Sequence, residues 1–141
     1  FEVSTNPGLP PGPLNKIASG GELARFLLAL KVVLADSQPP AVMVFDEVDS
    51  GIGGATASAV GERLARLADG VQVLVVTHSP QVAARGQHHW RVSKVTDGKI
   101  TATRVVPLTP DERREEIARM LAGTDVTDEA RAAAEMLMTG S

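Results

Sequence analysis

The sequence has 141 residues and a formal net charge of −3 at pH 7, with 43% hydrophobic and 22% charged residues. This composition is that of one globular domain, or one lobe of a larger domain, and excludes a disordered tail. There is no Cys, so disulfides and thiolate metal sites are excluded. The modest charge argues against a strongly basic nucleic-acid-binding module. No apolar stretch approaches the ~20 residues that a membrane-spanning helix requires, so we expect no membrane association.

The first predicted elements are a connector and a helix. Residues 1–15 start with Phe rather than Met and are dense in Pro and Gly, so we expect a connector within a longer polypeptide. Within residues 16–36, a helix is predicted from Glu22 onward because apolar residues recur at helical spacing. These residues are Leu23, Phe26, Leu27, Leu30 and Leu34. Pro39 and Pro40 end the helix.

Residues 41–79 predict a strand, a crossover helix and a second strand. The run 41–45 (AVMVF) is continuously apolar, which is typical of a parallel strand buried on both faces, and 71–79 (VQVLVVTHS) repeats this pattern. Helical spacing recurs between them, ending before Gly70. The residues at this spacing are Ala57, Val60, Leu64 and Leu67. In such a unit, the loops at the carboxyl ends of the strands are where ligands bind.

The remainder of the sequence predicts a hairpin and two helices. Two β-rich runs in residues 88–108 flank the turn sequence TDGK. Residues 109–141 are predicted to be helical: the first helix starts after the N-cap Thr109 and runs to about Leu121, and a short second helix follows Thr127. The predicted fold class is therefore α/β, with parallel strands and crossover helices followed by a β-hairpin and C-terminal helices.

Adjacent carboxylates follow the first buried strand. In VMVFDEVDSG (42–51), the strand delivers Asp46 and Glu47 to the carboxyl end of the sheet. One of them can hold a metal ion while the other orients or deprotonates a water molecule, as phosphoryl transfer to water requires. Asp49 and Ser50 extend this polar cluster. Acids at a strand end can equally cap the next helix or meet solvent, so the pair alone leaves both interpretations open.

A histidine and a glycine-rich helix start add two further features. His78 ends the second strand, where it can contact a phosphate oxygen or a water molecule, or serve a structural role. In KIASGGELARF, Ser19 and Glu22 have the spacing of a capping box. Gly20 and Gly21 each cost roughly 1 kcal/mol in a helix relative to Ala, which favours the close approach of an anion to this helix N-terminus. The capping role and a phosphate-binding role are compatible.

Together these motifs resemble the C-terminal lobe of an ATP-binding-cassette ATPase head. IASGGE resembles the signature motif, VMVFDE the Walker B strand, VDSGIGG the D-loop and VVTHS the switch-histidine strand, all within about 60 residues. Longer segments such as FDEVDSGIGGATASAVGERLA and REEIARMLAG resemble the RecN family of bacterial double-strand-break repair ATPases, which is related to structural-maintenance-of-chromosomes (SMC) proteins. The resemblance implies one head lobe over residues 1–141, in the bacterial cytoplasm or nucleoid.

The resemblance also implies cofactors, partners and residue roles. The cofactors would be ATP and Mg²⁺, with Asp46 holding Mg²⁺ through water. Glu47 would be the general base, and His78 would contact the γ-phosphate and the attacking water. Nucleotide bound by a second head would be touched by Ser19, Gly20, Gly21 and Glu22. The D-loop at the same interface would be Asp49, Ser50 and Gly51. The implied partners are an N-terminal ATPase lobe, a second head in an ATP-dependent homodimer, and DNA, particularly double-strand-break ends.

One departure from the family pattern concerns the phosphate-binding loop. The sequence contains no GxxxxGK[ST] motif, no assignable Q-loop and no heptad run. In the family that it resembles, these features belong to an N-terminal lobe and a long coiled coil. We therefore expect this chain to be half of a composite head that binds ATP weakly or not at all by itself.

Two alternative functions remain open. A metal-dependent nuclease or phosphotransferase would use Asp46, Glu47 and Asp49 as a two-metal cluster, but it gives the SGGE motif and His78 no joint purpose. In a non-catalytic interaction domain, the glycines would serve only turns. Basic residues around the hairpin could meet DNA phosphates, although an alternating charged strand face is usually only solvated. These residues are Lys94, Lys99 and Arg104.

Overall fold

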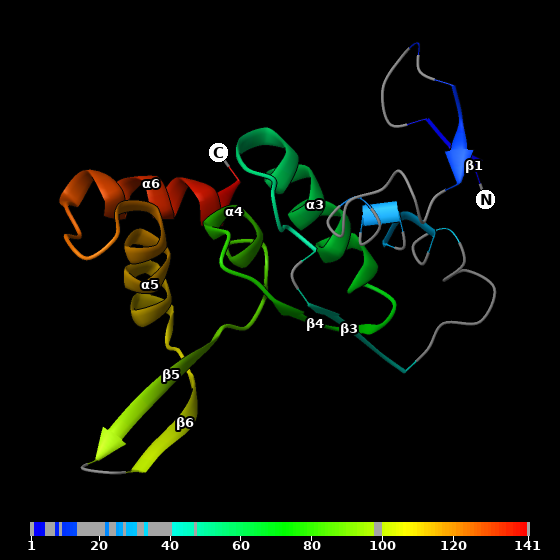
Figure 1. Ribbon diagram of the computed structural model, residues 1–141. Coiled ribbons are helices and arrows are strands. Elements are labelled where there is room, and N and C mark those ends of the chain that lie inside the picture. Colours follow the sequence, from blue (N-terminus) through cyan, green and yellow to red (C-terminus); the bar gives the residue numbers. More distant parts are fainter. Residues whose placement is uncertain are drawn as a thin grey trace. The chain divides into compact units, whose positions relative to one another are not determined.

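The computed structural model describes residues 2–4, 8, 10–13, 22, 25–26, 28–30, 33, 41–46, 48–97 and 100–140. The chain divides into two compact units, Phe1–His78 and Ser79–Ser141 (Figure 1). Several predicted site residues lie outside the described residues, namely Ser19, Gly20, Gly21, Glu47 and Lys99. In the described part of the chain, no helix is long and apolar enough to cross a membrane.

The first unit begins with a short strand pair and a helical segment. Strand β1 (Glu2–Val3) pairs antiparallel with β2 (Gly12–Pro13), within the predicted connector. Proline is tolerated in such a strand because no central ladder needs its missing N–H. The described residues between 22 and 33 are helical, as the periodicity predicts. Leu28, which is not on the predicted apolar face, is 2% exposed, whereas Phe26 and Leu30 are half-buried.

The predicted strand–helix–strand unit is confirmed. Strand β3 (Val42–Asp46) and strand β4 (Gln72–Val76) pair in parallel, and helix α3 (Gly54–Leu67) connects them (Figure 1). The helix buries the side chains that the spacing predicted, Ala57, Val60, Leu64 and Leu67. It ends three residues before Gly70, because residues 68–70 form turns whose N–H groups bond back to the last helical carbonyls.

The prediction that these strands are buried on both faces is wrong for the described structure. Along β3, exposure alternates: Met43 and Phe45 are each 5% exposed, whereas Val44 is 61% exposed. Val42 and Val76 on the same outer face are 46% and 57% exposed. A parallel sheet is normally covered on both sides. The described residues of this unit cover one face and leave a valine-rich face open.

The second unit contains the predicted hairpin and C-terminal helices. A short helix, α4 (Pro80–Ala83), precedes strands β5 (Trp90–Asp97) and β6 (Ile100–Pro107), which pair antiparallel. Helices α5 (Pro110–Ala122) and α6 (Asp128–Thr139) follow and pack against each other. Their core is formed by Ala84, Ile117, Ala118 and Ala134.

The start of α5 has the predicted chemistry. The Thr109 hydroxyl accepts a hydrogen bond from the Glu112 N–H, and the Glu112 carboxylate accepts one from the Thr109 N–H at 2.8 Å. This is a complete capping box, and Pro110 occupies the first helical position. The Thr109 bonds lower the pKa of Glu112, so the carboxylate stays ionised beside the helix N-terminus.

Candidate functional site

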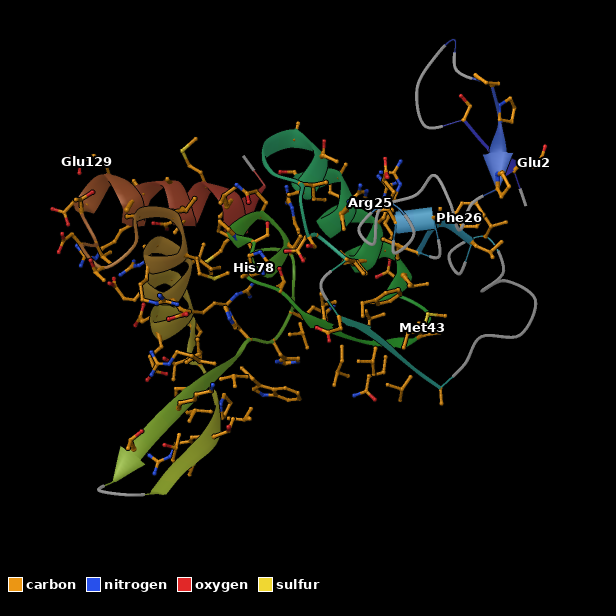
Figure 2. The ribbon with its side chains drawn as sticks, in the orientation of Figure 1. Glu2, Arg25, Phe26, Met43, His78 and Glu129 are labelled. Atoms are coloured by element: carbon orange, nitrogen blue, oxygen red, sulfur yellow. The ribbon has the colours of Figure 1, made fainter. Side chains whose placement is uncertain are left out.

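The predicted site residues of the first unit gather at one edge of the β3–β4 pair. The parallel register places Asp46 opposite Val76, so the residues that follow each strand leave the sheet at the same edge. Asp46 is exposed there, and His78 is exposed two residues beyond Val76 (Figure 2). The second carboxylate of the pair, Glu47, lies outside the described residues. A pattern of polar residues at two strand ends was sufficient to predict this edge.

Asp49 is not the open polar group that its position in the sequence suggests. Its side chain is buried, with 1% of the residue exposed, and Thr77 Oγ1 donates a hydrogen bond to Asp49 Oδ2. Thr77 therefore belongs to the site, although the sequence reasoning did not single it out. Its only sequence signal is a hydroxyl between an apolar strand and His78. The Asp49–Thr77 bond directly joins the two loops at this edge.

The backbone of the D-loop-like segment is held by two further contacts. The N–H of Ile52 donates to the Asp49 carbonyl at 3.2 Å, closing a turn. Gly51 lies in this turn at φ +72°, a conformation that favours glycine. From the preceding helical segment, Arg25 Nη1 donates to the Ser50 carbonyl at 3.4 Å (Figure 2 labels Arg25). Sequence reasoning also missed Arg25, because nothing in a helical pattern shows which backbone group a half-buried cation will reach.

The glycine-rich helix start is described only in part. Glu22 is helical and half-buried, while Ser19 and both glycines lie outside the described residues. The capping box at Ser19 and the open backbone N–H groups of this helix stay predictions.

The site fits a magnesium ion at one carboxylate. Asp46 is an exposed oxygen ligand at the strand end, and Mg²⁺ commonly binds proteins through one or two carboxylates while keeping several waters. No group of three or more His, Asp or Glu side chains is arranged to hold a metal in the described part of the chain. Asp46 is exposed and Asp49 is buried against Thr77, so the described residues do not favour the two-metal alternative.

The two described cations of the predicted DNA-contacting set, Lys94 and Arg104, do not share one face of the hairpin. Lys94 lies opposite Thr103 in the ladder, and Arg104 lies opposite Ser93. Because neighbouring residues of a strand face opposite sides, Lys94 and Arg104 project from opposite faces of the hairpin. This arrangement agrees with the interpretation that these cations are individually solvated.

An electrostatic cluster in the second unit joins the base of β5 to α5. Glu116 has a side chain only 7% exposed and accepts from Arg119 Nε at 3.0 Å and from Nη2 at 2.5 Å. The Arg119 hydrogen bonds lower the pKa of Glu116, and the charge of Arg91, 3.8 Å away, acts in the same direction. Burial, and secondarily the charge of Arg113, lowers the pKa of His89 from its ordinary 6.5.

His89 and Arg113 have structural contacts within the second unit. Arg113 Nη2 donates to the carbonyls of Ala83 and Ala84, at 3.4 and 2.7 Å, and so satisfies the end of α4. The carbonyl of His89 accepts from the Leu108 N–H at 2.9 Å at the base of the hairpin. Both contacts hold elements of the second unit together.

Comparison with known proteins identifies relatives that match nearly the whole chain. Over 138 residues it is 54% identical to a protein named DNA repair protein RecN from Xylella fastidiosa strain 9a5c, covering 98% of this chain and 25% of that protein. It is 56% identical over 123 residues to DNA repair protein RecN from Deinococcus radiodurans, covering 87% of this chain and 22% of the relative. The chain therefore spans about a quarter of the length of these curated relatives.

A family model and solved structures also match parts of the chain. Residues 22–84 match a family model described as "AAA domain, putative AbiEii toxin, Type IV TA system". A solved structure described as "Structural biochemistry of ATP-driven dimerization and DNA stimulated activation of SMC ATPases" superposes with a TM-score of 0.61 at 21% identity, covering 84% of this chain and 70% of that chain. The fold is thus mixed α/β and resembles SMC ATPase head domains, with the parallel strand pair and the antiparallel hairpin that the sequence predicts.

Proposed function

We propose that this chain, which is RecN-like over nearly its whole length, forms the C-terminal lobe of an ATP-hydrolysing head in a DNA repair protein. The observation that supports this proposal best is the common edge of β3 and β4, where Asp46, the Asp49–Thr77 bond and His78 lie together. Carboxylate, hydroxyl and imidazole groups at the carboxyl end of a parallel sheet are suited to binding and hydrolysing a phosphate ester.

Each residue would have a separate task in hydrolysis. Asp46 would hold Mg²⁺ through a water ligand, and Glu47 would orient or deprotonate the attacking water. His78, which is exposed at the same sheet edge as Asp46, would donate to the γ-phosphate and hold the same water in place. Bound magnesium would neutralise part of the charge that develops on the phosphate oxygens.

A second lobe would supply what this sequence lacks. There is no GxxxxGK[ST] motif in the chain, so the β- and γ-phosphates of ATP have no backbone cradle here. The open valine-rich face of the β3–β4 pair, formed by Val42, Val44 and Val76, supports docking of a further layer. We assign that layer to an N-terminal lobe carrying the phosphate-binding loop, consistent with relatives about four times longer than this chain.

Two assembled heads would then pair around ATP. Ser19, Gly20, Gly21 and Glu22 would meet the γ-phosphate of nucleotide held by the second head, with Asp49, Ser50 and Gly51 beside it. The SMC ATPase structure is itself described in terms of ATP-driven dimerization and DNA-stimulated activation. DNA, particularly double-strand-break ends, would be the substrate on which this cycle acts.

The test of this function is Glu47→Gln in the chain assembled with its phosphate-binding lobe. We expect ATP binding to be kept and turnover to fall by ~10² to 10⁴, because the variant loses the group that activates water. Nucleotide affinity and steady-state phosphate release would be measured. Glu62→Gln, at an exposed position on α3, is the matched control and should hydrolyse ATP normally. Undiminished hydrolysis by the Glu47 variant would contradict the assignment, and failure of the wild-type assembly to bind ATP would contradict the function.

A further inference from the structure

A buried hydrogen bond connects the loop after β3 with the loop after β4. Thr77 Oγ1 donates to Asp49 Oδ2, joining residues 28 positions apart in sequence. Asp49 is 1% exposed, so its carboxylate depends on protein donors rather than on bulk water. A hydrogen bond to a buried carboxylate is of the stronger kind, and its loss leaves a desolvated charge less well compensated. The bond therefore fixes the relative positions of the two loops.

Thr77 and His78 directly follow β4 and differ in their exposure. Val76 is 57% exposed, Thr77 is half-buried, and His78 is exposed. The Thr77 hydroxyl bonds the buried carboxylate of Asp49, whereas the next side chain, His78, is open to solvent at the same edge of the sheet. Because the two residues are neighbours in the chain, the Thr77 bond also restrains the backbone that carries His78. Rotating this backbone would break the bond to Asp49.

The Asp49 end of the bond is itself held in place. The Ile52 N–H bonds the Asp49 carbonyl at 3.2 Å, and Arg25 bonds the neighbouring Ser50 carbonyl at 3.4 Å. Val48, on the other side of Asp49, is 3% exposed and anchors the segment in the core. Because these contacts hold the Asp49 segment in place, the hydrogen bond from Thr77 to Asp49 restrains the backbone at Thr77.

We propose that Thr77 is a positioning residue for ATP hydrolysis, acting through Asp49 to set the direction of His78 relative to Asp46. This inference rests on the proposed function, in which His78 contacts the γ-phosphate and the attacking water. In this proposal, Thr77 itself contacts neither the γ-phosphate nor the attacking water. By restraining His78 before ATP binds, Thr77 lowers the entropy cost of placing the imidazole in the reactive position, and so lowers the activation free energy. It also links the D-loop segment, expected at the interface with a second head, to the group that acts on phosphate.

The kinetic test uses Thr77→Val and Thr77→Ser in the assembled ATPase head. Valine keeps the size of threonine and removes the hydroxyl, so we expect kcat to fall ~10-fold while KM for ATP changes less than about twofold. Serine retains the hydroxyl and should restore kcat to within about twofold of the wild type. Thr103→Val, at an exposed position of the hairpin, is the matched control. An unchanged kcat in Thr77→Val, or a serine variant as impaired as the valine variant, would overturn the proposal.

A second measurement does not depend on activity. In the 141-residue chain, Thr77→Val should shift the backbone amide NMR signals of residues 48–52 and His78, whereas Thr103→Val should shift only hairpin signals. A shift confined to Thr77 and its sequence neighbours would refute the link. If the wild-type assembly hydrolyses no ATP but Thr77→Val still shifts these amide signals, the proposed function is contradicted and the link between the two loops is not. The failure of the link and the failure of the function can therefore be told apart.

A double-mutant cycle covers the case in which Thr77→Val alone destabilises the chain. Asp49→Leu keeps the approximate size of the side chain but removes both acceptor oxygens, so it can accept no bond from Thr77. If Thr77 acts through Asp49, its replacement by Val should reduce kcat by a smaller factor in the Asp49→Leu background than in the wild type. Equal factors in the two backgrounds would show that Thr77 acts by another route.

Discussion

Neighbouring polar residues of this chain differ sharply in their contact with water. Asp46 is exposed at the end of β3, whereas Asp49 is 1% exposed and accepts a bond from Thr77. His88 is exposed, whereas His89 is half-buried and has its pKa lowered by burial and then by the charge of Arg113. Identical residue types a few positions apart are therefore expected to respond differently to substitution.

His89 should make the folded protein sensitive to mild acid. In the unfolded chain its imidazole takes up a proton near the ordinary pKa of 6.5, but in the fold burial and Arg113 oppose the charge, partly offset by Glu116. Since the unfolded state then binds more protons, the free energy of unfolding should fall as the pH drops below about 6.5. His89→Gln should flatten this dependence in urea unfolding between about pH 7 and about pH 5. His88→Gln, at the exposed neighbouring position, is the matched control, and an identical slope for both variants would refute the role of His89.

At the scale of elements, helix termini and strand runs were predictable because their signals are local. Thr109 is the N-cap of α5, as predicted, and α6 starts directly after Thr127, where a last helix is predicted. The strands at 42–46 and 72–76 also lie where the apolar runs indicate. The burial of β3 on one face only was not predictable, because the same apolar run suits a strand whose second covering layer comes from elsewhere.

Removing the cap of α5 should destabilise the second unit measurably. Thr109→Ala loses the hydroxyl that accepts from the Glu112 N–H, and we expect about 1 kcal/mol less free energy of unfolding. Chemical denaturation followed by far-ultraviolet circular dichroism would measure the change. Thr124→Ala, at an exposed position in the turn after α5, should be close to neutral. Equal changes in the free energy of unfolding for the two substitutions would show that the capping hydrogen bond does not stabilise the protein.

For the whole molecule, the candidate site was predictable as a location but not as a set of contacts. The order of the motifs predicts that Asp46 and His78 share a sheet edge, and the register of β3 and β4 confirms it. The bonds from Thr77 to Asp49 and from Arg25 to Ser50 join residues 28 and 25 positions apart. Such pairings depend on side-chain directions in the packed fold, which spacing along a sequence does not encode.

The valine-rich face should be essential for assembly and dispensable in the isolated chain. Val44 is 61% exposed, so Val44→Asp should leave the stability of this chain nearly unchanged. Once a second lobe covers that face, the carboxylate would be buried without a partner, at a cost of several kcal/mol. Co-purification with the N-terminal lobe should therefore be lost. Val33→Asp, at a position 70% exposed, is the control that should still assemble, and assembly of both variants would refute docking at this face.

The same open face has a consequence for the chain in isolation. Among the described residues, no further strand pairs with β3 or β4, and their outer face is rich in valine. The pair therefore offers other copies both an apolar surface and strand edges. The 141-residue chain should therefore self-associate without nucleotide as its concentration rises, and sedimentation velocity at increasing concentration would show it. Val44→Asp should suppress this association. The same exposed valines, Val42, Val44 and Val76, would then limit the solubility of the isolated chain and allow it to assemble with the second lobe.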